Sequence, residues 1–250
     1  MNNQKKHINR QLIFNTVIDA FVYLLIIPLL VYIGVKTKRY NILSVIIAAV
    51  CCIPHFLKFE KGGNGASELV IIASMIAISV VGRIIFTPLP GFKPVTAVVI
   101  ITGIAFGSEA GFITGSLTAL ISNIFMGQGP WTPFQMFVWG FIGYLSGILY
   151  KNIGDKKPNI ILLSLLGILS GVMFSLLMDI WTVISYDNQI TLSRYLYFVG
   201  QSFSFMAIYA VSNVIFLVIL AKPILVKTTR IKKKYGVFSK KIYVNEKNVV

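Results

Sequence analysis

Two segments rich in proline and glycine carry most of the side chains that could bind a small molecule. They span residues 86–94 and 127–135, and proline disfavours regular helix in both. The two segments, together with Trp139 just after the second one, contribute aromatic rings, side-chain amides and one cation. These residues are Phe92, Lys93, Gln128, Trp131, Gln135 and Trp139. Rings stack on flat ligands and amides hydrogen-bond to polar edges. This set predicts a binding mouth for a flat organic molecule with a polar edge.

Asp179 is the acidic residue that we add to this candidate site, because it lies near the end of its apolar segment on the same predicted side. A second interpretation of the aromatic residues stays open. Phe92 and Trp131 are also the kinds of residue that anchor a protein at the membrane–water interface. Taken singly, each of these residues favours the interface interpretation, whereas the two segments together favour neither.

Motifs for catalysis and for metal binding are absent from the sequence. It contains no G-x-x-x-x-G-K-[ST] phosphate loop, no H-E-x-x-H, no C-x-x-C and no nucleophile elbow. His7 and His55 are far apart, and the adjacent Cys51 and Cys52 lie inside an apolar run. We therefore expect no enzyme activity, no catalytic residue, no metal site and no cofactor. Energy for any uphill transport must come from an ion gradient or from a partner.

Acidic residues within the apolar segments are scarce, and Asp19 and Asp179 are the two deep candidates. Ion-coupled pumps place several ionisable groups inside the membrane, so this scarcity argues against self-contained ion coupling. Small residues, in contrast, recur at four-residue spacing, which lets helix backbones approach closely in lipid. The glycine pairs Gly103–Gly107, Gly111–Gly115, Gly143–Gly147 and Gly167–Gly171 favour packing within the chain. Ala73 and Ala77 show the same spacing.

The elements that must position these residues are membrane spans. Of the 250 residues, 56% are hydrophobic and only 12% are charged, about half of the ~25% in ordinary soluble domains. A span needs about 20 apolar residues, and we expect an all-α integral membrane protein. The apolar runs are 12–35, 41–57, 68–87, 95–107, 110–126, 132–150, 159–184 and 196–221. We expect 95–107 and 110–126 to be two short helices joined by a tight turn near Ser108 and Glu109.

The runs divide the chain into four parts. Residues 1–61 form an N-terminal segment with a helical hairpin, 62–67 a glycine-rich connector, 68–221 a six-helix core and 222–250 a basic tail. The tail carries nine Lys or Arg residues and one acid. The positive-inside rule therefore predicts a multi-pass protein of the cell membrane with a cytoplasmic C-terminus. It places residues 88–94 and 127–131 outside. We expect the tail to contact anionic membrane lipid and not nucleic acid.

Residues 68–149 resemble the substrate-binding (S) components of energy-coupling factor (ECF) vitamin transporters. The stretches that carry the resemblance are ELVIIASMIAISVVGRIIF, GFKPVTAVVIITGIAFG, EAGFITGSLTALISNIF and GQGPWTPFQMFVWGFIGYLSGIL. The resemblance implies a six-helix core that binds a vitamin at its outer face, beneath the loop after the first core helix. It implies docking through Ala73 and Ala77 on a transmembrane T component, which works with two ATPase subunits. About two additional N-terminal transmembrane helices depart from the family pattern.

The resemblance is closest to S components assigned to cobalamin or related corrinoids, and we expect such a ligand. The candidate residues are equally compatible with a flavin, a pterin or a pyridoxal-type vitamin. Two other classes of protein stay open as well. One is a self-sufficient, ion-coupled secondary transporter, and the other is a structural or regulatory membrane subunit that binds no small molecule.

Overall fold

The computed structural model describes residues 21–37, 39–61, 65–151, 159–187 and 190–238, and every element in these ranges is helical. The candidate Asp19 lies outside the described residues. So do residues 62–64 of the predicted connector and the last part of the basic tail, from residue 239 onward.

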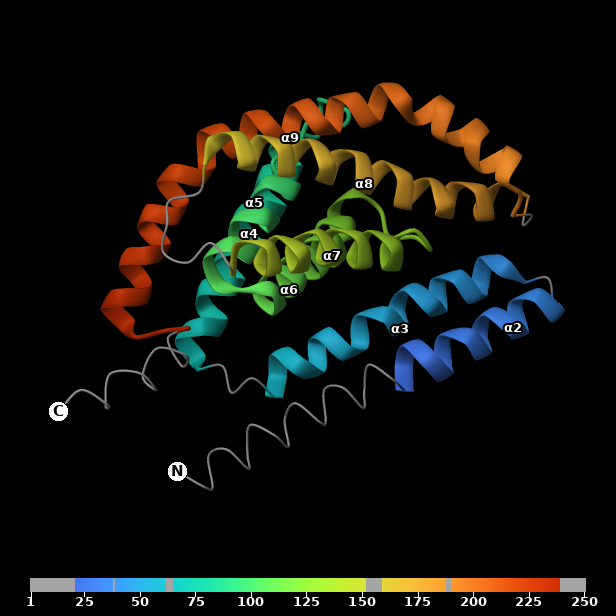
Figure 1. Cartoon of the computed structure of the whole chain (residues 1–250), viewed down its shortest axis with the longest axis horizontal. Coiled ribbons are helices and arrows are strands. Elements are labelled where there is room, and N and C mark those ends of the chain that lie inside the picture. Colours follow the sequence, from blue (N-terminus) through green and yellow to red (C-terminus); the bar gives the residue numbers. More distant parts are fainter. Residues whose placement is uncertain (1–20, 38, 62–64, 152–158, 188–189, 239–250) are drawn as a thin grey trace.

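Six consecutive helices form the core, in agreement with the predicted fold class. They are α4 (Ala66–Ile85), α5 (Val95–Phe106), α6 (Ser108–Met126), α7 (Thr132–Lys151), α8 (Ile160–Asp187) and α9 (Leu192–Tyr235). Before them come a π-helical turn, η1 (Phe21–Ile26), and the helices α2 (Ile27–Thr37) and α3 (Tyr40–Lys61). The helices α2 and α3 run side by side along one flank of the molecule (Figure 1), where α3 packs against α6 and α7.

Helix α5 lies at the centre of the core, with every residue except Ile104 buried. It has 12 residues, and at 1.5 Å per residue it is too short to cross a hydrocarbon layer of about 30 Å. Its partner α6 begins immediately after Gly107, which has a φ of 101°. That conformation is open to glycine and rarely to other residues. The predicted pair of short helices joined by a tight turn is therefore present.

Close backbone contact between α5, α6 and α7 replaces side-chain packing at the glycines. A Cβ atom added to Gly111 would lie 2.7 Å from the carbonyl carbon of Gly143 and 2.8 Å from the Cα atom of Gly103. Helices approach this closely only where no side chain separates them. Gly171 likewise packs against the backbone of Ala210, on α9. The glycine spacing serves packing within the chain, as the sequence favoured.

Helix α9 is much longer than the apolar run from which we predicted it. It continues past Lys222, the predicted start of the basic tail, to Tyr235, and it contains Pro223. Proline inside a helix removes a hydrogen bond and bends the helix, and α9 curves around the core (Figure 1). After Gly236 the chain turns back onto α4, where the Phe238 N–H donates to Glu68 Oε1 at 2.5 Å.

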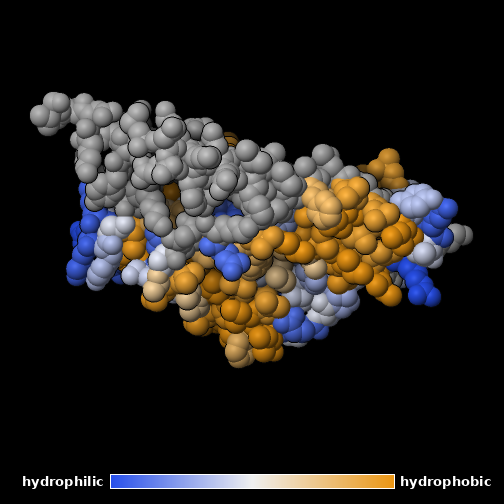
Figure 2. Space-filling model, turned by 90° about the horizontal axis from the view of Figure 1, so that it is seen from below, coloured by the Kyte–Doolittle hydropathy of each residue, from blue (hydrophilic) through white to orange (hydrophobic). Residues whose placement is uncertain are grey.

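The outer surface of the bundle is apolar over large areas (Figure 2). Ile161, Phe125 and Phe203 are each about two-thirds exposed or more, which suits contact with lipid and not with water. Within the described residues, α4, most of α8 and α9 are long and apolar enough to cross a membrane, and α5 is a shorter apolar helix. The protein is a multi-pass membrane protein.

The glycine contacts give a first prediction. In Gly143→Ala, the new methyl group would collide with the backbone of Gly111. Overpacking of this kind costs about 1–3 kcal/mol, so we expect a lower thermal unfolding midpoint in detergent. The matched control is Gly200→Ala on α9, where an added Cβ meets nothing within 4 Å. That variant should unfold at or above the wild-type temperature. Equal midpoints for both variants would contradict the packing role of Gly143.

Candidate functional site

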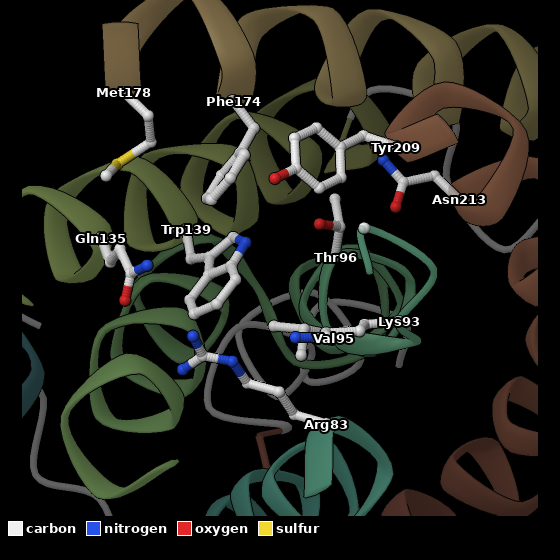
Figure 3. A pocket seen from close by; sticks show the side chains of 11 residues that line it. Arg83, Lys93, Val95, Thr96, Gln135, Trp139, Phe174, Met178, Tyr209 and Asn213 are labelled. Carbon is white, nitrogen blue, oxygen red and sulfur yellow. The ribbon is translucent and has the colours of Figure 1, made fainter. Parts of the chain in front are cut away.

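A cavity of about 170 Å³ lies among five core helices. Its walls come from the last turn of α4, the loop of residues 86–94, the start of α5, and the facing sides of α7, α8 and α9 (Figure 3). The lining residues are Arg83, Gly91, Lys93, Val95, Thr96, Gln135, Trp139, Phe174, Met178, Tyr209 and Asn213. Each helix contributes one or two side chains, so the cavity exists only in the assembled bundle.

Arg83 is the most deeply placed cation of the cavity, with 7% of its surface exposed. Its Nη1 donates to Ser122 Oγ and, at 2.7 Å, to Asn123 Oδ1, both on α6. Its guanidinium carbon lies 4.8 Å from the centre of the Trp139 ring, in cation–π geometry. The Nε atom is buried and has no hydrogen-bond partner. All of the partners of Arg83 are neutral, and one of its donors stays unused.

Asn123 joins Arg83 to α7. Its Nδ2 donates to Thr132 Oγ1 and to Gln135 Oε1, both at 2.9 Å. These bonds fix the orientation of the Gln135 amide, because its oxygen is held by Asn123. The amide nitrogen of Gln135 then lies on the side of Trp139, toward the cavity (Figure 3). The network therefore presents hydrogen-bond donors to a ligand.

Three aromatic rings form one wall. The Trp139 ring stacks on Phe174 with centroids 5.2 Å apart, and Phe174 meets Tyr209 edge to face at 5.3 Å. Figure 3 shows Trp139 between Arg83 and Phe174. Both faces of the Trp139 ring are thus occupied, and its edge is what a ligand would meet. A planar ligand can therefore meet the edge of Trp139 with its own face, in edge-to-face geometry.

The loop of residues 86–94 forms part of the cavity wall and is tied to α9 through its backbone. The Ser212 hydroxyl accepts from the Lys93 N–H at 2.9 Å and donates to the Lys93 carbonyl at 3.2 Å. Gly91 has a φ of 75°, and an added Cβ would lie 3.0 Å from Ile208. The loop thus passes tightly over α9, and it requires glycine at this point.

Lys93 adds a second positive charge to the cavity. Burial, together with the positive charge of Arg83, lowers the pKa of Lys93 from its usual value. The described lining residues include no acid, and no group of three potential metal ligands occurs in the described part of the chain. The arrangement suits recognition of a ligand through rings and hydrogen-bond donors.

The structure brings three of the seven predicted binding residues, Lys93, Gln135 and Trp139, to the cavity. Phe92 instead packs against Phe86 and Phe216, which anchors the loop. Asp179 is buried but does not line the cavity, and it accepts from the Ser202 hydroxyl at 2.5 Å.

The other two predicted binding residues, Gln128 and Trp131, lie in the segment between α6 and α7. Gln128 Nε2 donates to the Leu120 carbonyl, and its Oε1 accepts from Thr132. The Trp131 ring lies over Gly129 and is 38% exposed. Neither residue lines the cavity.

Several lining residues were not singled out as binding residues from the sequence, among them Arg83, Thr96, Phe174, Met178, Tyr209 and Asn213. A cation in an apolar helix is a signal of function, and this signal was present for Arg83. The Asn213 Nδ2 donates to the Gly167 carbonyl at 3.1 Å, so this side chain also joins α9 to α8. No comparable pattern marks Phe174 or Met178 within their apolar helix.

Comparison with known proteins identifies the family. The model of the ECF-type riboflavin transporter S component matches residues 64–230, which include all of α5 to α8, all of α4 and most of α9. Searches of curated proteins and of solved structures gave no significant match. The match covers two-thirds of the chain and contains every residue of the cavity. The chain belongs to the family of ECF-type riboflavin transporter S components.

Proposed function

We propose that this protein is the substrate-binding subunit of an ATP-driven ECF importer and that it captures a flavin. The observation that carries the proposal is the cavity, which combines an aromatic wall with inward-facing donors in a chain of the riboflavin S-component family. The isoalloxazine ring of a flavin is flat, and one edge carries carbonyl groups and ring nitrogens. Trp139, Phe174 and Tyr209 suit its face, while Arg83 and Gln135 suit its edge.

A flavin fits the cavity better than the corrinoid expected from the sequence. At about 170 Å³ the cavity is smaller than the ~300–1,000 Å³ typical of ligand pockets, so even a flavin requires the loop of residues 86–94 to move outward. A corrin macrocycle with its nucleotide tail is several times larger. It would require separation of α7, α8 and α9 as well. Cobalamin therefore serves as the competing ligand in the binding experiment below.

The cavity belongs at the outer face of the membrane in this proposal, and the C-terminus in the cytoplasm. The loop of residues 86–94 lies at the end of α4 that carries Arg83, whereas Glu68 and the basic end of α9 lie together at the opposite end of α4. The last turn of α9 contains Lys232, Lys233 and Lys234. Clustered lysines next to a span favour the cytoplasmic side.

Helix α4 supplies the docking face in this proposal. Ala73 and Ala77 are exposed on it, next to the exposed Val70, Ile78 and Val81. The opposite side of α4, with Ile72, Ile76 and Val80, packs into the core. A stripe of small residues on an otherwise apolar, outward-facing helix allows close approach of a partner helix in lipid. The T component and its two ATPase subunits are the partners.

Energy coupling gives the first prediction of this proposal. The purified chain should bind riboflavin without ATP, because the cavity is complete in the chain and the sequence contains no phosphate loop. Uptake into liposomes should appear only when the T component and ATPase subunits are present with ATP. Sustained uptake by the chain alone would instead identify a secondary transporter. Binding of cobalamin in place of riboflavin would overturn the flavin assignment.

Two glutamines of the same region provide a matched test of the cavity. Gln135→Ala removes a donor that lines the cavity and leaves a ligand polar group unpaired, at a cost of about 1–3 kcal/mol. We expect riboflavin affinity to fall by about tenfold to a hundredfold in calorimetric titration. Gln128→Ala alters a side chain outside the cavity, and its affinity should stay within about threefold of wild type. A larger loss of riboflavin affinity in Gln128→Ala than in Gln135→Ala would place the site at the segment between α6 and α7.

Matched tryptophan substitutions test the docking face. Ala73→Trp and Ala77→Trp place a large ring on the exposed stripe of α4 and should prevent co-purification with the T component. Ala207→Trp makes the same change at an exposed alanine of α9, outside the proposed docking face, and should leave the complex intact. Riboflavin binding should persist in all three variants. Loss of riboflavin binding in the α4 variants would show that the alanines serve the fold of the chain itself.

A further inference from the structure

The charge of the cavity is not balanced by the protein. Arg83 is buried, and its hydrogen-bond partners, Ser122 and Asn123, are neutral. Its Nε has no partner. In the part of the chain that the structure describes, neither Arg83 nor Lys93 forms an ion pair with a carboxylate. A buried guanidinium without a counter-ion is unfavourable, and here the Arg83 side chain lines a cavity.

Lys93 increases this imbalance. It lines the same cavity, and the positive charge of Arg83 is one of the two causes that lower its pKa. The nearby acid Asp179 does not compensate, because it lies outside the lining and is held by the Ser202 hydroxyl. The folded protein therefore holds two cations near one another in a partly dehydrated site.

We propose that the cavity binds its ligand as an anion, with an oxyanion group of the ligand, a phosphate or a carboxylate, placed between Arg83 and Lys93. A neutral carbonyl oxygen would accept from the guanidinium but would leave the repulsion between the two cations in place. An oxyanion accepts from both cations and removes that repulsion, and the planar guanidinium matches its geometry. The proposal rests on the proposed function for the flavin ring, and the charge requirement follows from Arg83 and Lys93 alone. Applied to a flavin, it means that a flavin with such an anionic group is preferred to riboflavin.

Three flavins with the same ring system test the proposal: riboflavin, riboflavin 5′-phosphate and 10-carboxymethylflavin. Calorimetric titration of the full chain in detergent should show that at least one of the anionic flavins binds about tenfold to a hundredfold more tightly than riboflavin, as expected for charge-assisted hydrogen bonds. The anionic flavin whose affinity exceeds that of riboflavin shows which oxyanion group, phosphate or carboxylate, the cavity binds. Riboflavin binding as tightly as both anionic flavins would overturn the anion proposal and leave the flavin assignment standing.

Variants assign the preference to the two cations. The measured quantity is the affinity for the anionic flavin divided by the affinity for riboflavin. Arg83→Gln should bring this ratio to within about threefold of one. Arg83→Lys keeps the charge and should retain part of the preference for the anion. Lys93→Gln should lower the ratio in the same direction, and it serves if Arg83→Gln does not fold. Arg194→Gln is the control, because it removes a positive charge that does not line the cavity, and its ratio should equal that of wild type. An unchanged ratio in both cavity variants would overturn the proposal.

A measurement without any flavin separates the two proposals. Inorganic phosphate should raise the thermal unfolding midpoint of the wild-type chain above its value in chloride at equal ionic strength, and Arg83→Gln should not respond. If no flavin binds, the proposed function fails, and the phosphate result alone decides the charge requirement. Absence of a phosphate effect in wild type, together with no preference among flavins, would refute that requirement.

Discussion

The contact of α5, α6 and α7 at their glycines is the constraint on which the rest of the structure depends. Lipid is as apolar as a leucine side chain, so helices in a membrane associate through close packing and not through water exclusion. At Gly103, Gly111 and Gly143 the backbones themselves touch. That contact fixes the sliding position of α7 against α6. Trp139 lies one turn from Gly143, and Gln135 lies two turns from it, so the contact sets the height at which both reach the cavity.

The polar network follows from this position. Asn123 on α6 lies within 2.9 Å of Gln135 on α7 and within 2.7 Å of Arg83 on α4, so one amide joins three helices. Hydrogen bonds are strong where water is excluded, and unpaired groups are costly there. The network therefore holds α4 against the α6–α7 pair at the end of the bundle where apolar packing gives way to the loop. It also orients the side chains that face the ligand.

Regular features of the fold could be predicted from the sequence because they follow from local chemistry. Apolar runs predicted the core helices, and the break between α5 and α6 falls at Gly107, beside the turn predicted near Ser108 and Glu109. The length of α9 was underestimated, since lysines were taken as its end, although cations are favourable near a helix C-terminus. The residues of the candidate site were harder to predict. Lys93, Gln135 and Trp139 lie beside the breaks that drew attention to them, but Phe174 and Tyr209 depend on which helix face turns inward, and that is set by contacts between distant segments. Gln128 bonds to Leu120 and Thr132, and the Trp131 ring packs over Gly129. Residue type does not reveal such local contacts.

One hydroxyl, that of Ser212, holds the loop of residues 86–94 by both backbone groups of Lys93. Because the attachment uses the N–H and the carbonyl of the main chain, it is indifferent to which side chain the loop carries at that position. A mutation at position 93 can therefore change the side chain that faces a ligand without removing the attachment of the loop to α9. The side chain at position 93 can change, and the range of accepted ligands can change with it. The hydrogen bonds between Ser212 and the loop backbone would persist. The structure thus separates the attachment of the loop at Ser212 from the side chain that the loop presents at position 93.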